Sequence, residues 1–221
     1  MASVPHHYLE GPPRQVPGLD GLHRMAGMLL AETMPEDGRV LVLGAGGGME
    51  IKALATMQAG WQFEGVDPSA DMLALAREVT APFADRVFLR EGTIEAASAG
   101  PFDGAICLLT FHFIAREERA RVLAALRARL KPGAPLVLAH ISFSQDEPER
   151  MQWIARHAGY PDGKTAEGQR LQAAEEAMTS RLIILPPEDD VAMLEAAEFE
   201  RVTLFYAALS FRGWVAYAPG G

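Results

Sequence analysis

Short apolar runs alternate with stretches of helical periodicity along most of the chain. The apolar runs predict strands at residues 39–44, 61–67, 86–90, 102–109 and 135–141. Between them, apolar residues recur at intervals of three and four, which predicts helices at residues 49–59, 69–79 and 116–131. Strands that alternate with helices in this way form a parallel sheet with helices on both faces. We therefore expect a doubly wound, mostly parallel α/β fold.

The last third of the chain has a different pattern. Glu188-Asp189-Asp190 opens a helix that runs to about Glu198, and two runs rich in β-forming residues follow at residues 202–209 and 211–217. We interpret these runs as an antiparallel hairpin that completes a seven-stranded sheet. The segment 142–185 is too long for a plain connection and has helical pieces around its Gly/Pro breaks. It predicts a helical cap over a site.

The length of 221 residues suits one α/β domain, so we expect residues 1–221 to form a single unit. Four parts follow from the pattern. They are an N-terminal segment and helix at 1–36, a ligand-binding core at 37–141, the cap at 142–185, and the last helix with the hairpin at 186–221.

The first predicted strand runs directly into a glycine-rich loop with the sequence GAGGG. Glycines allow a ligand to approach the backbone closely, and open α/β sheets bind ligands at the carboxyl ends of their strands. The spacing is G-x-G-x-G, because the third glycine of the dinucleotide pattern G-x-G-x-x-G would fall on Met49. Gly44, Ala45, Gly46 and Gly48 are therefore candidate ligand-binding residues, but not for a nicotinamide dinucleotide.

Other candidates follow the ends of the next strands. Asp67, with Pro68, ends the second strand roughly twenty residues after the loop, where a carboxylate can accept both ribose hydroxyls. Helix capping is the alternative for Asp67. Gly92 and Thr93 follow the third strand and are placed to meet an adenine edge, although an ordinary loop fits equally well. Leu109 belongs to an apolar wall after the fourth strand.

Two histidines are candidates for a general base. His140 ends the fifth strand and His112 follows the fourth, although a packed histidine is the competing interpretation for His112. Tyr206 of the hairpin is a candidate for an acceptor pocket, with core packing as the alternative. Asp103 lies at the amino end of its strand, so we treat it as structural.

Composition narrows the class of partner. A formal net charge of −9 disfavours direct binding to nucleic acid, which depends on clustered Lys and Arg. No apolar stretch reaches the length of a membrane span, and the first residues carry no secretory pattern, so we expect a cytoplasmic protein away from membranes. Cys107 is the only cysteine, which excludes an internal disulfide. The acidic residues 188–190 are explained by a helix dipole, so no metal is expected.

These motifs together resemble class I S-adenosylmethionine-dependent methyltransferases. The resemblance covers VLVLGAGGG at 40–48, FEGVDPSADM at 63–72, EGT at 91–93, FHF at 111–113 and LKPGAPLVL at 130–138. A narrower resemblance over nearly the whole chain is to the carboxy-S-adenosylmethionine synthase family. It includes the VPG helix at 16–32, residues 117–138, and the hairpin at 199–216.

The wider resemblance implies an enzyme that transfers a methyl group from S-adenosylmethionine to a small molecule, with S-adenosylhomocysteine as product. The narrower one implies an alternative, synthesis of a carboxylated cofactor from S-adenosylmethionine and prephenate. In that family an arginine in the insert holds the transferred carboxylate, and Arg170 is the nearest counterpart here. Arg14, before the VPG motif, is a second candidate for an anion. A non-catalytic cofactor-binding module is the third alternative, and a homodimer is left open.

Overall fold

The computed structural model describes residues 6–220 and is built around one sheet of seven strands. The strands are β1 (Arg39–Leu43), β2 (Gln62–Asp67), β3 (Val87–Glu91), β4 (Gly104–Leu108), β5 (Pro135–Ile141), β6 (Glu200–Ala208) and β7 (Phe211–Tyr217). Their order across the sheet is β3-β2-β1-β4-β5-β7-β6. The pairs among the first five strands are parallel, whereas β7 is antiparallel to both β5 and β6. This confirms the expected parallel sheet with an antiparallel hairpin.

Eight α-helices connect and flank these strands within the described residues. They are α1 (Gly11–Gln15), α2 (Leu19–Ala31), α3 (Met49–Met57), α4 (Ala70–Val79), α5 (Arg116–Arg127), α6 (Glu149–Gly159), α7 (Gly168–Arg181) and α8 (Pro187–Ala196). Short 3-10 helices flank several of them, including one at His6–Glu10 before α1 and one at Phe111–Phe113 before α5. In this part of the chain, no helix is both long and apolar enough to cross a membrane.

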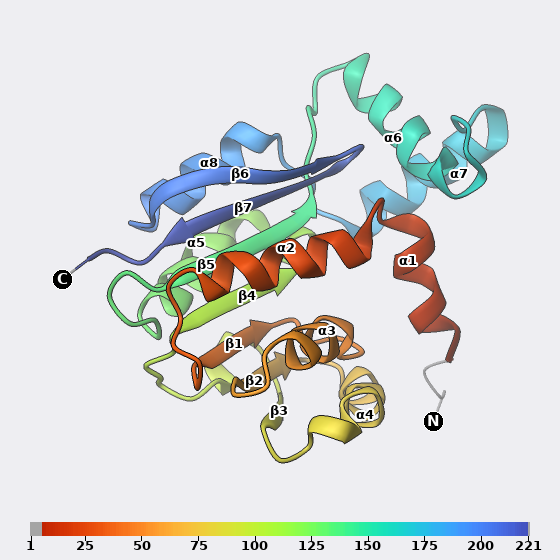
Figure 1. The fold of residues 1–221 in the computed structure, drawn as a ribbon. Coiled ribbons are helices and arrows are strands. Elements are labelled where there is room, and N and C mark those ends of the chain that lie inside the picture. Colours follow the sequence, from red (N-terminus) through yellow and green to blue (C-terminus); the bar gives the residue numbers. More distant parts are fainter. Residues whose placement is uncertain (1–5, 221) are drawn as a thin grey trace.

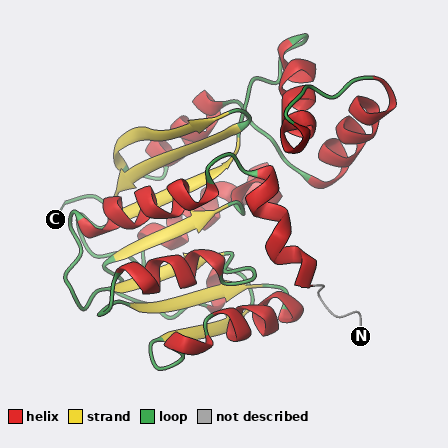
Figure 2. Ribbon diagram, turned by 45° about the vertical axis from the view of Figure 1, so that its right-hand side comes forward, coloured by secondary structure: helices red, strands yellow, loops and turns green. Residues whose placement is uncertain are grey.

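Helices cover both faces of the sheet (Figure 2), and alternate residues of β1 pack against the helices on the two sides. Val40 and Val42 of β1 pack in a cluster that includes residues of α2, α3 and α4. Leu41 and Leu43 point the other way, into a cluster formed with α5 and α8. Because β1 is buried on both faces, its sequence is a continuous apolar run rather than an alternation.

Two predicted elements are longer than the elements in the structure. The helix predicted to reach residue 131 ends at Arg127, and the strand predicted from residue 102 begins at Gly104. Phe102 instead forms an isolated bridge with Leu130, with its N–H donating to the Arg129 carbonyl at 2.8 Å. Periodicity alone could not locate this contact, since its partners are far apart in sequence.

The acidic start of α8 pairs with basic residues of α5. Asp189 lies 2.9 Å from Arg116, and Asp190 lies 3.1 Å from the fully buried Arg119. Arg119 also donates to the Ile114 carbonyl. These ion pairs give Asp189 and Asp190 structural partners and hold α8 against α5.

The segment 142–185 forms α6 and α7 with a tight turn between them. Figure 1 shows both helices beside α1, beyond the carboxyl ends of the parallel strands, while the C terminus lies at the opposite edge. The segments at this edge therefore come from three distant parts of the chain. A ligand site at this edge would therefore combine residues that are far apart in the sequence.

Candidate functional site

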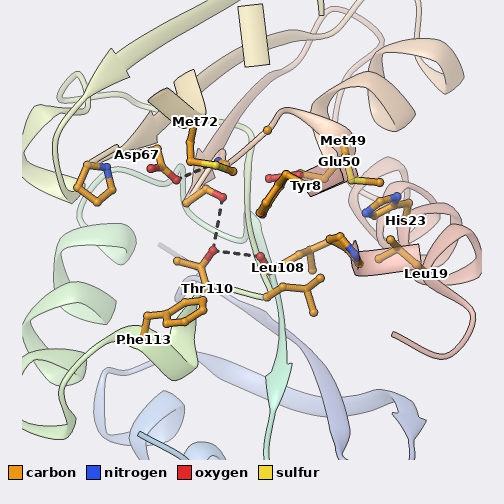
Figure 3. Close-up of a pocket in the computed structure, with 16 residues that line it drawn as sticks. Tyr8, Leu19, His23, Met49, Glu50, Asp67, Met72, Leu108, Thr110 and Phe113 are labelled. Atoms are coloured by element: carbon orange, nitrogen blue, oxygen red, sulfur yellow. Dashed lines mark hydrogen bonds between the residues drawn. The ribbon is translucent and has the colours of Figure 1, made fainter. Parts of the chain in front are cut away.

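A cavity of about 350 Å³ opens at the carboxyl ends of β1, β2 and β4. We call it the glycine-loop cavity. Figure 3 shows its lining, which is drawn from the N-terminal segment, α2, the glycine loop and the residues after β2 and β4. The lining residues are Tyr8, Pro12, Leu19, His23, Gly44, Gly46, Gly47, Met49, Glu50, Asp67, Pro68, Met72, Leu108, Leu109, Thr110 and Phe113.

The glycine loop adopts a conformation that side chains disfavour. Gly44, Gly46 and Gly48 have φ values of 76°, 48° and 76°, in the left-handed region. Gly44 has a second constraint, because a Cβ at this position would overlap the side chain of Thr110. The Thr110 hydroxyl in turn donates to the Leu108 carbonyl at 3.1 Å. The conformation of the loop therefore requires glycine for two reasons, the positive φ angles and the close approach of Thr110, which follows β4.

Asp67 sits at the end of β2 and fixes the loop. Its Oδ2 accepts a hydrogen bond from the Gly46 N–H at 2.9 Å, and its Oδ1 accepts one from the Ser69 N–H at 2.9 Å. Ser69, whose hydroxyl accepts from the Met72 N–H at 3.3 Å, is the N-cap of α4. Each Asp67 oxygen can accept a further hydrogen bond. Asp67 thus joins the glycine loop to the start of α4 and lines the cavity.

Five of the nine residues predicted for the cofactor lie on this cavity, namely Gly44, Gly46, Asp67, Pro68 and Leu109. Leu109 has a φ of 57°, which is uncommon for a non-glycine residue and occurs here at the site. The other four, Ala45, Gly48, Gly92 and Thr93, are not among the lining residues. Ala45 is fully buried, and Thr93 is exposed and donates to Glu95. Gly92 and Thr93 therefore lie outside the lining of this cavity, and their contact with an adenine edge stays a prediction.

Glu50 and Tyr8 line the cavity although no motif predicted them. Burial raises the pKa of the Glu50 carboxyl to about 8, with the nearby Asp67 carboxylate adding to the shift. Burial also raises the pKa of the Tyr8 phenol, with Glu50 and Asp67 as further causes. Glu50 could have been suspected from its place two residues after the glycine loop. Tyr8 gave no signal, since only the fold brings the N-terminal segment to this edge.

A second cavity of about 460 Å³ adjoins the first and extends toward α6 and α7. We call it the cap cavity. The two cavities share Tyr8, Pro12, Leu109 and Phe113. The remaining lining residues of the cap cavity are Gly11, Gln15, Val16, His112, Ile141, His157, Ala177, Met178, Arg181, Leu182 and Phe211. The 142–185 segment thus contributes directly to a site, through His157 of α6 and Arg181 of α7.

His112 lines the cap cavity in a defined tautomer. Its Nδ1 accepts a hydrogen bond from the Ile141 N–H at 3.2 Å, so a neutral ring carries its proton on Nε2. Burial lowers the pKa of His112 well below its usual value, and the neighbouring His140, Arg119 and His157 lower it further. His112 is therefore neutral at neutral pH and can donate a hydrogen bond into the cavity.

His140 does not reach either cavity. Its ring is fully buried between Phe111 and Trp214, at centroid distances of 5.6 and 5.7 Å. Its Nε2 lies 3.5 Å from Asp190, on the side of the sheet covered by α5 and α8. The prediction that His140, at the end of β5, faces a ligand is wrong, because its side chain points to the face of the sheet that α5 and α8 cover.

The three residues predicted to bind the substrate also lie outside both cavities. Arg14 is 75% exposed and lies 3.8 Å from Glu10, while Arg170 is bound to Asp162 and to the Ala158 carbonyl on the surface. The Tyr206 phenol donates to the Pro17 carbonyl at 2.5 Å, and burial raises its pKa to about 12. None of the three lines the two cavities. Tyr206 instead fastens the hairpin to the segment before α2.

The sheet order and the site at its carboxyl edge define the class I fold of S-adenosylmethionine-dependent methyltransferases. A family model described as a methyltransferase domain matches residues 41–136, which run from β1 into β5. The chain therefore has the class I methyltransferase fold and is similar in sequence to a methyltransferase domain over β1 to β5.

Comparison with known proteins agrees with this class. The carboxy-S-adenosyl-L-methionine synthase of Chromohalobacter salexigens is 29% identical over 211 residues, covering 92% of this chain and 77% of that protein. An O-methyltransferase family protein from Burkholderia thailandensis superposes with a TM-score of 0.67 at 14% identity, covering 93% of this chain and 56% of that chain. Human N-acetylserotonin methyltransferase in complex with SAM gives 0.60 at 16% identity, covering 92% and 54%. The chain thus spans just over half the length of these two solved structures.

Proposed function

We propose that this chain binds S-adenosylmethionine in the glycine-loop cavity and transfers its methyl group to a small molecule in the cap cavity. The observation that carries the proposal is that the two cavities adjoin each other, since they share the lining residues Tyr8, Pro12, Leu109 and Phe113. Two molecules bound in the adjoining cavities would lie next to each other. When bound, the cofactor supplies an activated methyl group, so the chain mainly has to align the two molecules.

The charges of the residues that line the glycine-loop cavity are complementary to the positive groups of this cofactor. Among the described residues that line it, the acidic ones are Asp67 and Glu50, and no Lys or Arg is present. S-adenosylmethionine carries a sulfonium and an ammonium group, which such a cavity favours. Asp67 would hold the ribose hydroxyls through its free lone pairs, and the open backbone at Gly44 and Gly46 would accommodate the middle of the molecule.

In the cap cavity, the polar residues support positioning of an acceptor rather than removal of its proton. His112 donates from Nε2 because its Nδ1 already accepts the Ile141 N–H. Arg181 adds a cation, and no carboxylate lines this cavity among the described residues. We therefore propose an acceptor with an anionic or hydrogen-bond-accepting group. The apolar side chains of Met178 and Phe211 would exclude water from it.

Synthesis of a carboxylated cofactor is a second candidate, favoured by one specific observation. Arg181, from the 142–185 segment, lines the cavity that adjoins the proposed cofactor site, which is the kind of place a transferred carboxylate would occupy. Several relatives between 21% and 29% identical carry the name carboxy-S-adenosyl-L-methionine synthase. Arg181 replaces Arg170 as the residue to test.

The first experiment is calorimetric titration of the protein with S-adenosylmethionine, followed by mass spectrometry of the small molecules that co-purify with it. We expect micromolar binding, and the absence of binding would reject both candidates. Incubation with S-adenosylmethionine and prephenate then separates them. A carboxylated product that Arg181→Ala abolishes and Arg170→Ala preserves would favour the synthase, while methylation of another metabolite with no such product favours the methyltransferase.

A further inference from the structure

Glu50 is a buried carboxyl group that faces a cavity without a partner from another residue. It lies in the first turn of α3 and is only 9% exposed. Within the described part of the chain, no ion pair or hydrogen bond joins its carboxylate to another residue, and only its own backbone N–H opposes the rise of its pKa. A buried carboxylate of this kind normally requires a counter-charge or several donors.

The groups around Glu50 do not supply a positive charge. Tyr8 comes from the N-terminal turn, His23 from α2, Asp67 from the end of β2 and Cys107 from β4. Burial lowers the pKa of His23, despite the opposing effect of Asp20, so this ring is neutral at neutral pH. The cavity around Glu50 therefore has a negative charge balance and favours a cation.

The position of Glu50 indicates which cation. Figure 3 shows Asp67 on one side of the glycine-loop cavity, and Glu50 with His23 on the other. With a ribose at Asp67, the amino-acid end of the same molecule would extend past the loop toward Glu50. We propose that Glu50 binds the α-ammonium group of the methionine part of S-adenosylmethionine. This inference rests on the proposed function.

Binding would then be coupled to loss of a proton. The raised pKa means that the Glu50 carboxyl is mostly protonated at pH 7, whereas an α-ammonium group is still mostly charged there. The carboxyl must ionise to pair with the ammonium group, so affinity should rise with pH to a maximum near pH 8 and fall above it, where the ammonium group itself loses its proton. Charge-assisted hydrogen bonds are about twice as strong as neutral ones, so loss of this charge should weaken binding roughly tenfold to a hundredfold.

The test compares wild type and Glu50→Gln in calorimetric titrations with three ligands. These are S-adenosylmethionine, S-adenosylhomocysteine, which lacks the sulfonium charge, and 5′-methylthioadenosine, which lacks the amino-acid group. We expect the variant to bind the first two at least tenfold more weakly and the third with unchanged affinity. A loss confined to S-adenosylmethionine would place Glu50 at the sulfonium and overturn the proposal. Unchanged affinity for all three would also overturn it.

A second measurement keeps the result independent of folding effects. Titrations at pH 7 in two buffers of different ionisation enthalpy count the protons released on binding. Wild type should release close to one proton per S-adenosylhomocysteine, and Glu50→Gln close to none. Equal release by both proteins would contradict the role of Glu50. If wild type binds none of the three ligands, it is the proposed function that fails.

Discussion

The carboxylate of Asp67 accepts a hydrogen bond from the Gly46 N–H at 2.9 Å, which ties the end of β2 to the middle of the glycine loop. The second oxygen accepts from the Ser69 N–H at the same distance. Both oxygens are therefore used by the backbone before any ligand binds. The N-cap of α4 is Ser69, so the capping interpretation of Asp67 is wrong: its carboxylate holds the backbone of two loops and lines the cavity.

Asp67→Asn should lower both stability and cofactor affinity. An amide presents only one acceptor oxygen, so its NH₂ group would oppose either the Gly46 or the Ser69 N–H. We expect the free energy of unfolding to fall by about 1–3 kcal/mol and the affinity for S-adenosylmethionine to fall by roughly ten- to a hundredfold. Urea unfolding and calorimetry measure the two effects.

Asp103→Asn is the matched control for this variant. Asp103 also uses both oxygens, accepting from the Arg39 N–H at 2.9 Å and from the Lys131 ammonium at 2.6 Å, but it lies at the amino end of β4. It should lose stability to a similar extent and keep its cofactor affinity. An equal loss of affinity in both variants would mean that Asp67 acts only through the fold.

Gly44→Ala should destabilise the protein more than Gly133→Ala. The two glycines have similar φ values of 76° and 74°, so an alanine at either position costs about 1–2 kcal/mol of backbone strain. At Gly44 the new methyl group would also overlap Thr110, whereas nothing lies within 4 Å at Gly133. We expect a further loss of about 1–3 kcal/mol at Gly44 alone, together with loss of S-adenosylmethionine binding. Similar urea midpoints for the two variants would contradict the clash.

Glu50→Gln should become more stable than wild type as the pH rises. The folded pKa of about 8 is above the ordinary value of 4.5, so between these values the folded state holds a proton that the unfolded state has lost. The stability that Glu50 contributes is therefore fully present below about pH 4.5 and is lost as the pH rises toward 8. Glutamine does not titrate, so the difference between variant and wild type should grow by on the order of 3 kcal/mol from pH 4.5 to pH 7. Parallel stability curves from urea unfolding at several pH values would show that the Glu50 pKa is not raised.

Tyr206→Phe should lower stability without changing cofactor binding. It removes the hydrogen bond to the Pro17 carbonyl, which joins β6 to the segment before α2, and this should cost about 0.5–1.5 kcal/mol. Tyr206 is outside both cavities, so the dissociation constant for S-adenosylmethionine should stay within about twofold of the wild-type value. A larger change in affinity, with stability unaltered, would return Tyr206 to the list of ligand-binding residues.

The sequence determined the strands, the order of β and α elements and the location of the glycine loop. These features depend on neighbours in the chain: a continuous apolar run for β1, the spacing of Gly44, Gly46 and Gly48, and a capping signal after Asp67. Each of them is a local property of backbone conformation or periodicity. For the same reason, the edge of the sheet that carries the cavities could be predicted from the carboxyl ends of the strands.

Only the tertiary structure decided which side chains face that edge. His140 ends a strand that reaches the site, but its side chain points to the α5 and α8 face. Tyr8 and Arg181 are far from the glycine loop in sequence and reach the two cavities only because the N-terminal segment and the cap fold over the same edge. The direction of a side chain on a strand buried on both faces, and the meeting of distant segments, are set by long-range packing. Local sequence patterns do not contain that information.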